Sequence, residues 1–160
     1  MLEQLHTAKR IINDGQNVVP AWRIEAPDGH WLILTPFDHD KPDQREHMLQ
    51  FVCRFMAWKL ATFFVLVAET RLGASPTRTG VEEAVFAISH VRGERLVFMQ
   101  RIHRQPALSF GGLECVKPRD IDSDYWSLLP AREETIAPEK AKELERIFGE
   151  HGELPAQKLH

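Results

Sequence analysis

The sequence predicts an α+β domain in which helices pack on a mixed, mostly antiparallel sheet. Strand-like runs come in pairs joined by short turn sequences, and only a few segments have helical periodicity. The expected order of elements is α-ββ-α-β-ββ-α. The chain has 160 residues, 43% of them apolar and 27% charged, which is enough to bury a core as one domain. We therefore expect a single domain over residues 1–150 and a flexible tail over 151–160.

The N-terminal third predicts one helix and one hairpin. Apolar residues in 2–13 recur at helical spacing, and a turn sequence follows them. The next two strand-like runs, 18–27 and 30–37, are separated by Asp28-Gly29. Asp-Gly between two such runs is typical of a β-hairpin.

A long helix and a buried strand come next. Residues 43–61 have strong helical periodicity, and the run TFFVLVAET at 62–70 is aromatic, β-branched and almost continuously apolar. Such a run is typical of a central strand that is covered on both faces. If this strand is a parallel neighbour of the strand at 30–37, the helix is the crossover between them.

The C-terminal half predicts a second hairpin, one more strand and a last helix. The hairpin joins 82–92 to 95–104 around Gly93-Glu94, which would place His90 opposite Val97. A strand at 108–117 contains two adjacent glycines, which indicate a bulge or a bend. The last helix is expected from Pro138 to about Phe148, since proline favours the first helical position.

The segment TPFDHDKPDQREHM at 35–48 allows two interpretations. Asp43 followed by Glu46 resembles a capping box, and acidic residues at this point would complement the helix dipole. In this interpretation the acidic residues only start the helix at 43–61.

The second interpretation is a metal or acid–base site at the ends of two strands. Asp38, His39 and Asp40 follow the strand at 30–37, and Glu69 closes the otherwise apolar buried strand. Parallel strands would bring these side chains to one edge of the sheet, where carboxylates and an imidazole can hold a divalent cation. Asp38, His39 and Glu69 are the candidate catalytic residues, and Asp40 joins them as a candidate metal ligand.

Established site motifs are absent from the sequence. It contains no HxxxH, HxH or CxxC spacing, no phosphate-binding glycine loop and no GxSxG elbow. We therefore predict no cofactor, with a divalent metal at the acidic segment as the alternative.

The long helix has more apolar surface than packing on a sheet requires. One stripe, with Val52 and Met56 at its centre, is assigned to the sheet. A second stripe is rotated from it by more than a quarter turn and consists of Met48, Phe51, Phe55 and Trp58. Either another helix of the chain covers this second stripe, or a second subunit does. We predict a homodimer with the second stripe at its interface.

Charge and hydropathy indicate which partners to expect, and the cysteines indicate the compartment. The formal net charge of −3 provides no overall attraction to nucleic acid, and no apolar run is long enough for a membrane span. We expect neither nucleic acid nor membrane as a partner, and leave an unidentified protein partner open. Cys53 and Cys115 lie in apolar-rich segments and are expected to be buried free thiols, which fits the cytoplasm.

The hairpin around Asp28-Gly29, the long helix and the buried strand ending in Ala68-Glu69 together resemble a loose group of small uncharacterised bacterial and mobile-element proteins. The resemblance covers about residues 17–104. In that group the buried strand tends to end in Glu-Ala-Trp, whereas this chain continues with Thr70. The resemblance implies the order of elements and no particular chemistry.

From the residues alone we expect a small cytoplasmic, non-catalytic binding or interaction protein that self-associates. The alternative is a metal-assisted hydrolase or nuclease that uses the acidic residues at the strand ends.

Overall fold

The computed structural model describes residues 1–35, 42–72, 82–91, 94–117, 139, 142–143, 146 and 156–159. In these ranges it contains helices α1 (Leu2–Asn13) and α2 (Pro42–Lys59). The strands are β1 (Ala21–Ala26), β2 (Gly29–Leu34), β3 (Phe63–Leu72), β4 (Glu82–Val91), β5 (Glu94–His103), β6 (Ser109–Val116) and β7 (Ala156–Leu159).

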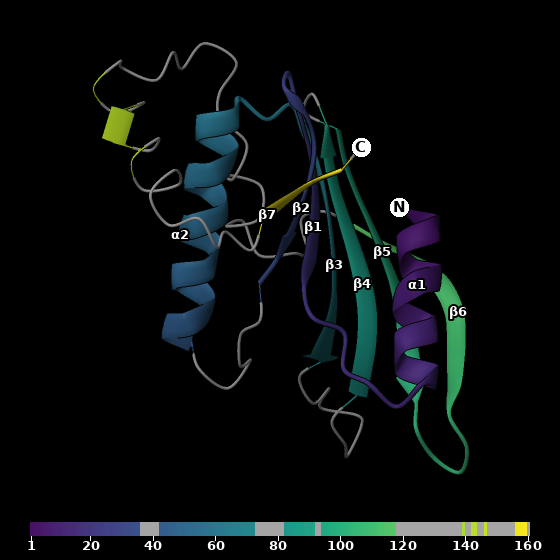
Figure 1. Ribbon diagram of the computed structural model, residues 1–160. Coiled ribbons are helices and arrows are strands. Elements are labelled where there is room, and N and C mark those ends of the chain that lie inside the picture. Colours follow the sequence, from purple (N-terminus) through teal and green to yellow (C-terminus); the bar gives the residue numbers. More distant parts are fainter. Residues whose placement is uncertain are drawn as a thin grey trace.

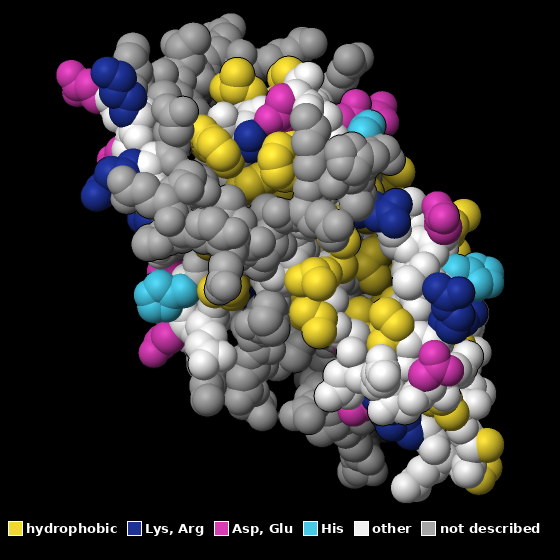
Figure 2. Space-filling model, viewed as in Figure 1, with side chains coloured by type: hydrophobic (Ala, Val, Ile, Leu, Met, Phe, Trp, Pro, Cys, Tyr) yellow, Lys and Arg dark blue, Asp and Glu magenta, His cyan; other side chains and the backbone are white. Residues whose placement is uncertain are grey.

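The described strands form one sheet of seven strands, in the order β6-β5-β4-β3-β1-β2-β7. Helix α2 packs on one face of the sheet and α1 on the other (Figure 1). In the space-filling view, hydrophobic side chains gather towards the middle of the visible face and charged side chains lie mostly towards its margins (Figure 2). The α+β class predicted from the sequence is therefore confirmed.

The predicted parallel pairing is wrong. All pairings between the described strands are antiparallel, so the sheet is not mixed in this part of the chain. Strands β2 and β3 do run in the same direction, but β1 lies between them and pairs with both. Helix α2 therefore crosses over β1 instead of joining two adjacent strands.

Strand β3 lies at the centre of the sheet and is buried on both faces, as its apolar run predicts. Its residues Phe64 to Ala68 are all less than 5% exposed. On the α2 side, Phe64 and Leu66 join a core whose other members include Trp22, Phe55 and Met56. On the α1 side, Val65 and Val67 pack with residues of α1, β4 and β5. We call these two sides of the sheet the α2 face and the α1 face.

Both hairpins turn one residue earlier than predicted. Ala26 pairs with Gly29 in the first hairpin and Val91 pairs with Glu94 in the second. His90 is therefore opposite Arg95 and not opposite Val97. In contrast, the predicted bulge at the two adjacent glycines of β6 is confirmed, because the register between β5 and β6 shifts at this point.

The end of the chain differs from the predicted flexible tail, because Ala156–Leu159 pairs with β2 as an edge strand. Within the predicted last helix, positions 139, 142, 143 and 146 are helical, and the remainder lies outside the described residues. Both cysteines are free, but Cys53 is only half-buried and Cys115 is exposed, so their predicted burial is wrong. Over the described ranges, neither helix has the length and hydropathy needed to cross a membrane.

Candidate functional site

Of the four candidate residues of the predicted metal or acid–base site, the structure describes Glu69; Asp38, His39 and Asp40 lie outside the described residues. The Glu69 carboxylate accepts hydrogen bonds from the Val18 backbone N–H at 3.3 Å and from Arg104 Nη2 at 2.7 Å. A carboxylate already paired with a guanidinium has less capacity to bind a metal ion. Glu69 is therefore placed as the partner of a cation from its own chain.

Two arginines neutralise the acidic side chains at this end of the sheet. Arg104 pairs with Glu83 as well as Glu69, and Arg101 pairs with Glu82 and Glu114. The side-chain hydrogen bond to Glu83 raises the pKa of Arg104, and the one to Glu114 raises the pKa of Arg101. Across the residues with described positions, no group of three or more His, Cys, Asp and Glu side chains is arranged to hold a metal ion.

The second stripe of α2 is not available as a whole for a dimer interface. Phe55 is 0% exposed, and its ring packs edge-on against Trp31 at 5.5 Å and Trp58 at 5.8 Å between centroids. The prediction that Phe55 lies at an interface is therefore wrong, because the chain itself buries this ring. Met48, Phe51 and Trp58 are half-buried and flank it.

The C-terminal end of α2 is fixed to the first hairpin by a partly buried cation. Lys59 Nζ lies 3.8 Å from the centroid of the Trp58 ring and 4.4 Å from that of Trp31. It also pairs with the Asp28 carboxylate at 2.8 Å, and the same carboxylate accepts a hydrogen bond from Trp31 Nε1. An aromatic side chain of α2 thus makes a cation–π contact within the chain.

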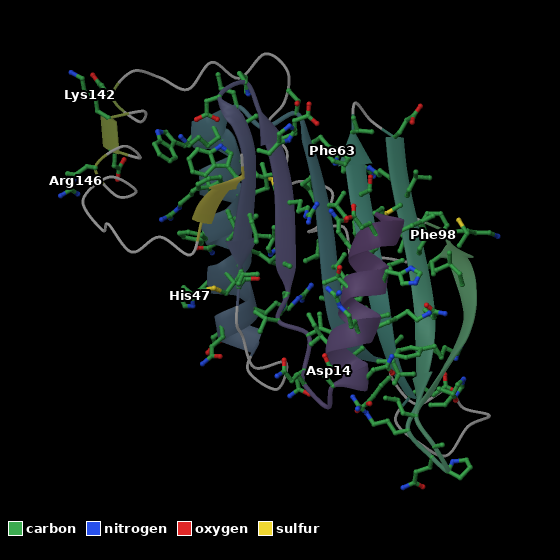
Figure 3. All side chains as sticks on the ribbon, turned by 45° about the vertical axis from the view of Figure 1, so that its right-hand side comes forward. Asp14, His47, Phe63, Phe98, Lys142 and Arg146 are labelled. Atoms are coloured by element: carbon green, nitrogen blue, oxygen red, sulfur yellow. The ribbon has the colours of Figure 1, made fainter. Side chains whose placement is uncertain are left out.

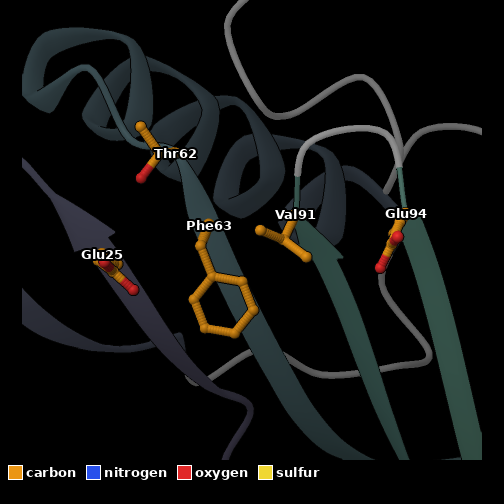
Figure 4. A pocket seen from close by; sticks show the side chains of 5 residues that line it. All are labelled: Glu25, Thr62, Phe63, Val91 and Glu94. Atoms are coloured by element: carbon orange, nitrogen blue, oxygen red, sulfur yellow. The ribbon is translucent and has the colours of Figure 1, made fainter.

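A hollow on the α1 face is the best candidate for a ligand site. It has a volume of about 300 Å³ and is lined by Glu25, Thr62, Phe63, Val91 and Glu94 (Figure 4). Phe63 lies near the N-terminal end of α1, at the opposite end of the helix from Asp14 (Figure 3). These residues come from the end of β1, the start of β3, the end of β4 and the start of β5.

Strand register places four of these residues in one line across the sheet. Glu25 pairs with Phe63, Phe63 with Val91, and Val91 with Glu94. Cross-strand partners project to the same face, so a phenyl ring and an isopropyl group lie between two carboxylates. We call Glu25, Phe63, Val91 and Glu94 the Phe63 row.

A second hollow of about 340 Å³ adjoins the first, because Glu25 and Phe63 line both. Its lining also includes Gln4 from α1 and the exposed side chains of Arg23 and His30. The Gln4 Oε1 atom is buried and has no hydrogen-bond partner within the part of the chain that the structure describes. The two hollows together offer an apolar floor with hydrogen-bond acceptors around it.

The carboxylates of the Phe63 row differ from the other acidic residues of the sheet. Within the described ranges, Glu25 and Glu94 make no side-chain hydrogen bond or ion pair. At the other end of the sheet, Glu69 and Glu83 are paired with Arg104. The row is thus a place where negative charge stays exposed beside apolar side chains.

His90 is a buried polar residue near this end, but on the α2 face. Its ring packs edge-on against Phe64, with 6.1 Å between centroids. Burial lowers the pKa of His90, and the charge of Arg95 beside it lowers the pKa further. His90 therefore belongs to the core and does not line either hollow.

Comparisons of the chain with protein-family models, with curated proteins and with solved structures found no match.

The Phe63 row is not predicted by the sequence. Its members lie between positions 25 and 94, and no local motif joins them. The two hairpins can be predicted from the sequence. The row, however, can be identified only when the registers of β1 with β3, β3 with β4 and β4 with β5 are all known.

Proposed function

We propose that this protein is a non-catalytic binding protein whose ligand site is the hollow around the Phe63 row. The ligand carries a positive charge on an apolar body. The observation that carries the proposal is the position of two carboxylates, one on either side of Phe63 and Val91, that form no ion pair with any described residue. Both carboxylates are exposed, and an ionised carboxylate forms strong charge-assisted hydrogen bonds with a bound ammonium group.

The apolar part of the ligand follows from the floor of the hollow. Phe63 and Val91 are half-buried and offer an aromatic ring and a branched aliphatic group to a bound molecule. An aromatic face also attracts cations. Ligand sites of this kind combine an apolar lining with a few polar groups that set orientation.

Binding without catalysis is supported by the polar groups of the lining. His30 is opposite Glu25 across β1 and β2, yet no hydrogen bond joins the two side chains. A histidine base is usually oriented by such a bond. Among the lining residues that the structure describes, no base is oriented by a hydrogen bond, and the carboxylates are better suited to holding a charge.

The experiment is calorimetric titration with hexylamine and, as its anionic counterpart, hexanoate. Hexylamine is expected to bind saturably. Glu25→Gln or Glu94→Gln is expected to weaken the affinity for hexylamine severalfold. Glu46→Gln, at an exposed position of α2, is the matched control and should have no effect. Preferential binding of hexanoate, or hexylamine binding unchanged in both row variants, would refute the proposal.

We propose self-association through α2 as a second property of the protein. Phe55 is buried within the chain, but the other three residues of the second stripe are only half-buried, which supports this proposal. These residues are Met48, Phe51 and Trp58. Light scattering at micromolar concentration should give the mass of a dimer for the wild type and of a monomer for Phe51→Glu. Gln50→Glu places the same charge at an exposed neighbouring position and should stay dimeric. A monomeric wild type would exclude this property.

The compartment is part of the same proposal. Cys115 is a free thiol on the surface, and such thiols persist in reducing environments. We therefore propose the cytoplasm.

A further inference from the structure

We infer that the ligand of the Phe63 row is a linear aliphatic diammonium compound, of the polyamine class, with one ammonium group at Glu25 and one at Glu94. This inference rests on the proposed binding function and adds the length and charge pattern of the ligand. It follows from the order of the four side chains, which is acid, aromatic, aliphatic, acid.

The spacing of the two carboxylates excludes one compact cation as their shared partner. Glu25 and Glu94 lie on β1 and β5, which are separated by β3 and β4. Three strand spacings place their backbones about 14 Å apart. One ammonium group can contact only one of these carboxylates, so a ligand that neutralises both must extend across the strands.

The middle of the row fits an alkyl chain. Phe63 and Val91 occupy the two positions between the acids, and Leu96 on β5 adds a further apolar side chain that is 46% exposed. Leu96 is on the same face, two residues after Glu94. A methylene chain laid across these groups would bury apolar surface on both partners.

The neighbouring charges make the two ends of the row unequal. Arg23 and His30 project to the α1 face beside Glu25, and Gln4 brings the first turn of α1 near this end. Arg95, which follows Glu94, pairs with His90 and projects to the opposite face. The Glu94 end is therefore the more negative one, and we expect it to bind the first ammonium group.

The test uses diamines that differ in length but not in charge. Decamethylenediamine can span the row, whereas putrescine, with four methylene groups, cannot reach both carboxylates. Calorimetry should show decamethylenediamine binding about tenfold or more tighter than putrescine, since only the longer diamine gains a second charge-assisted contact. Glu25→Gln and Glu94→Gln should each weaken the binding of decamethylenediamine. In the double variant the change in binding free energy should differ from the sum of the two single changes. Both positions are exposed, so circular dichroism should show unchanged folding.

The possible outcomes separate this inference from the proposed function. If hexylamine binds as tightly as decamethylenediamine to the wild type, the function stands and the diammonium inference is wrong. If none of the amines binds, both are wrong. An extended peptide whose two lysines lie four residues apart spans about 13 Å and presents the same chemistry. Tighter binding of that peptide than of decamethylenediamine would overturn the assignment to a free polyamine.

Discussion

The substitution Phe55→Ala tests whether this side chain stabilises the core, as the structure shows, or forms a dimer interface, as the helical periodicity of α2 predicts. Its side chain is fully buried, in edge-on contact with the rings of Trp31 and Trp58. Removal of a buried phenyl ring costs about 3–5 kcal/mol, which includes the cavity that it leaves. The lost ring contacts contribute about 0.5–1.5 kcal/mol each to such a change. Because a folded domain is stable by only about 5–15 kcal/mol, Phe55→Ala should remove a large part of that stability.

Urea unfolding followed by tryptophan fluorescence measures this change. The midpoint should fall markedly while the slope stays constant, since the surface exposed on unfolding is almost unchanged. Phe51→Ala is the matched control on the same helix, and its half-buried ring should cost clearly less. A Phe55→Ala protein with wild-type unfolding free energy but half the mass would refute the placement of this ring in the core.

Two further predictions concern buried or partly buried polar groups. Asp28→Ala removes the carboxylate that holds Lys59 and Trp31, and it should lower the free energy of unfolding by about 1–2 kcal/mol in urea titrations. Unchanged stability would mean that the two indole rings alone hold the ammonium group. His90 has a lowered pKa in the folded state, so the unfolded chain binds its proton more readily. Stability should be constant above the ordinary histidine pKa of about 6.5 and should fall as the pH drops below it. This fall should be smaller in His90→Gln and unchanged in His47→Gln, a control at an exposed position of α2; equal pH profiles for all three proteins would contradict it.

The sequence predicts those parts of the fold that depend on local pattern. The continuous apolar run of β3 indicates burial on both faces, and the structure confirms it from Phe64 to Ala68. The two glycines of β6 indicate a bulge, because glycine has no side chain to pack and weakens the interior of a strand. The bounds of α1 and α2 agree with their periodicity to within two residues.

Features that depend on long-range pairing could not be predicted in this way. A turn that moves by one residue changes every cross-strand pair, so the predicted partner of His90 was wrong although the hairpin was right. Helical periodicity identifies two apolar stripes on α2 but does not show that Phe55, together with Val52 and Met56, faces the sheet. The Phe63 row depends on three strand registers, and the pattern within any one strand specifies none of them.

The most direct test of the binding site is an amide chemical-shift titration of the isotope-labelled protein with decamethylenediamine. We predict that the largest shift changes fall on Glu25, Phe63, Val91 and Glu94, and that they saturate together with one dissociation constant. Largest changes on α2, or small changes spread over all acidic residues without saturation, would contradict a ligand site at the Phe63 row.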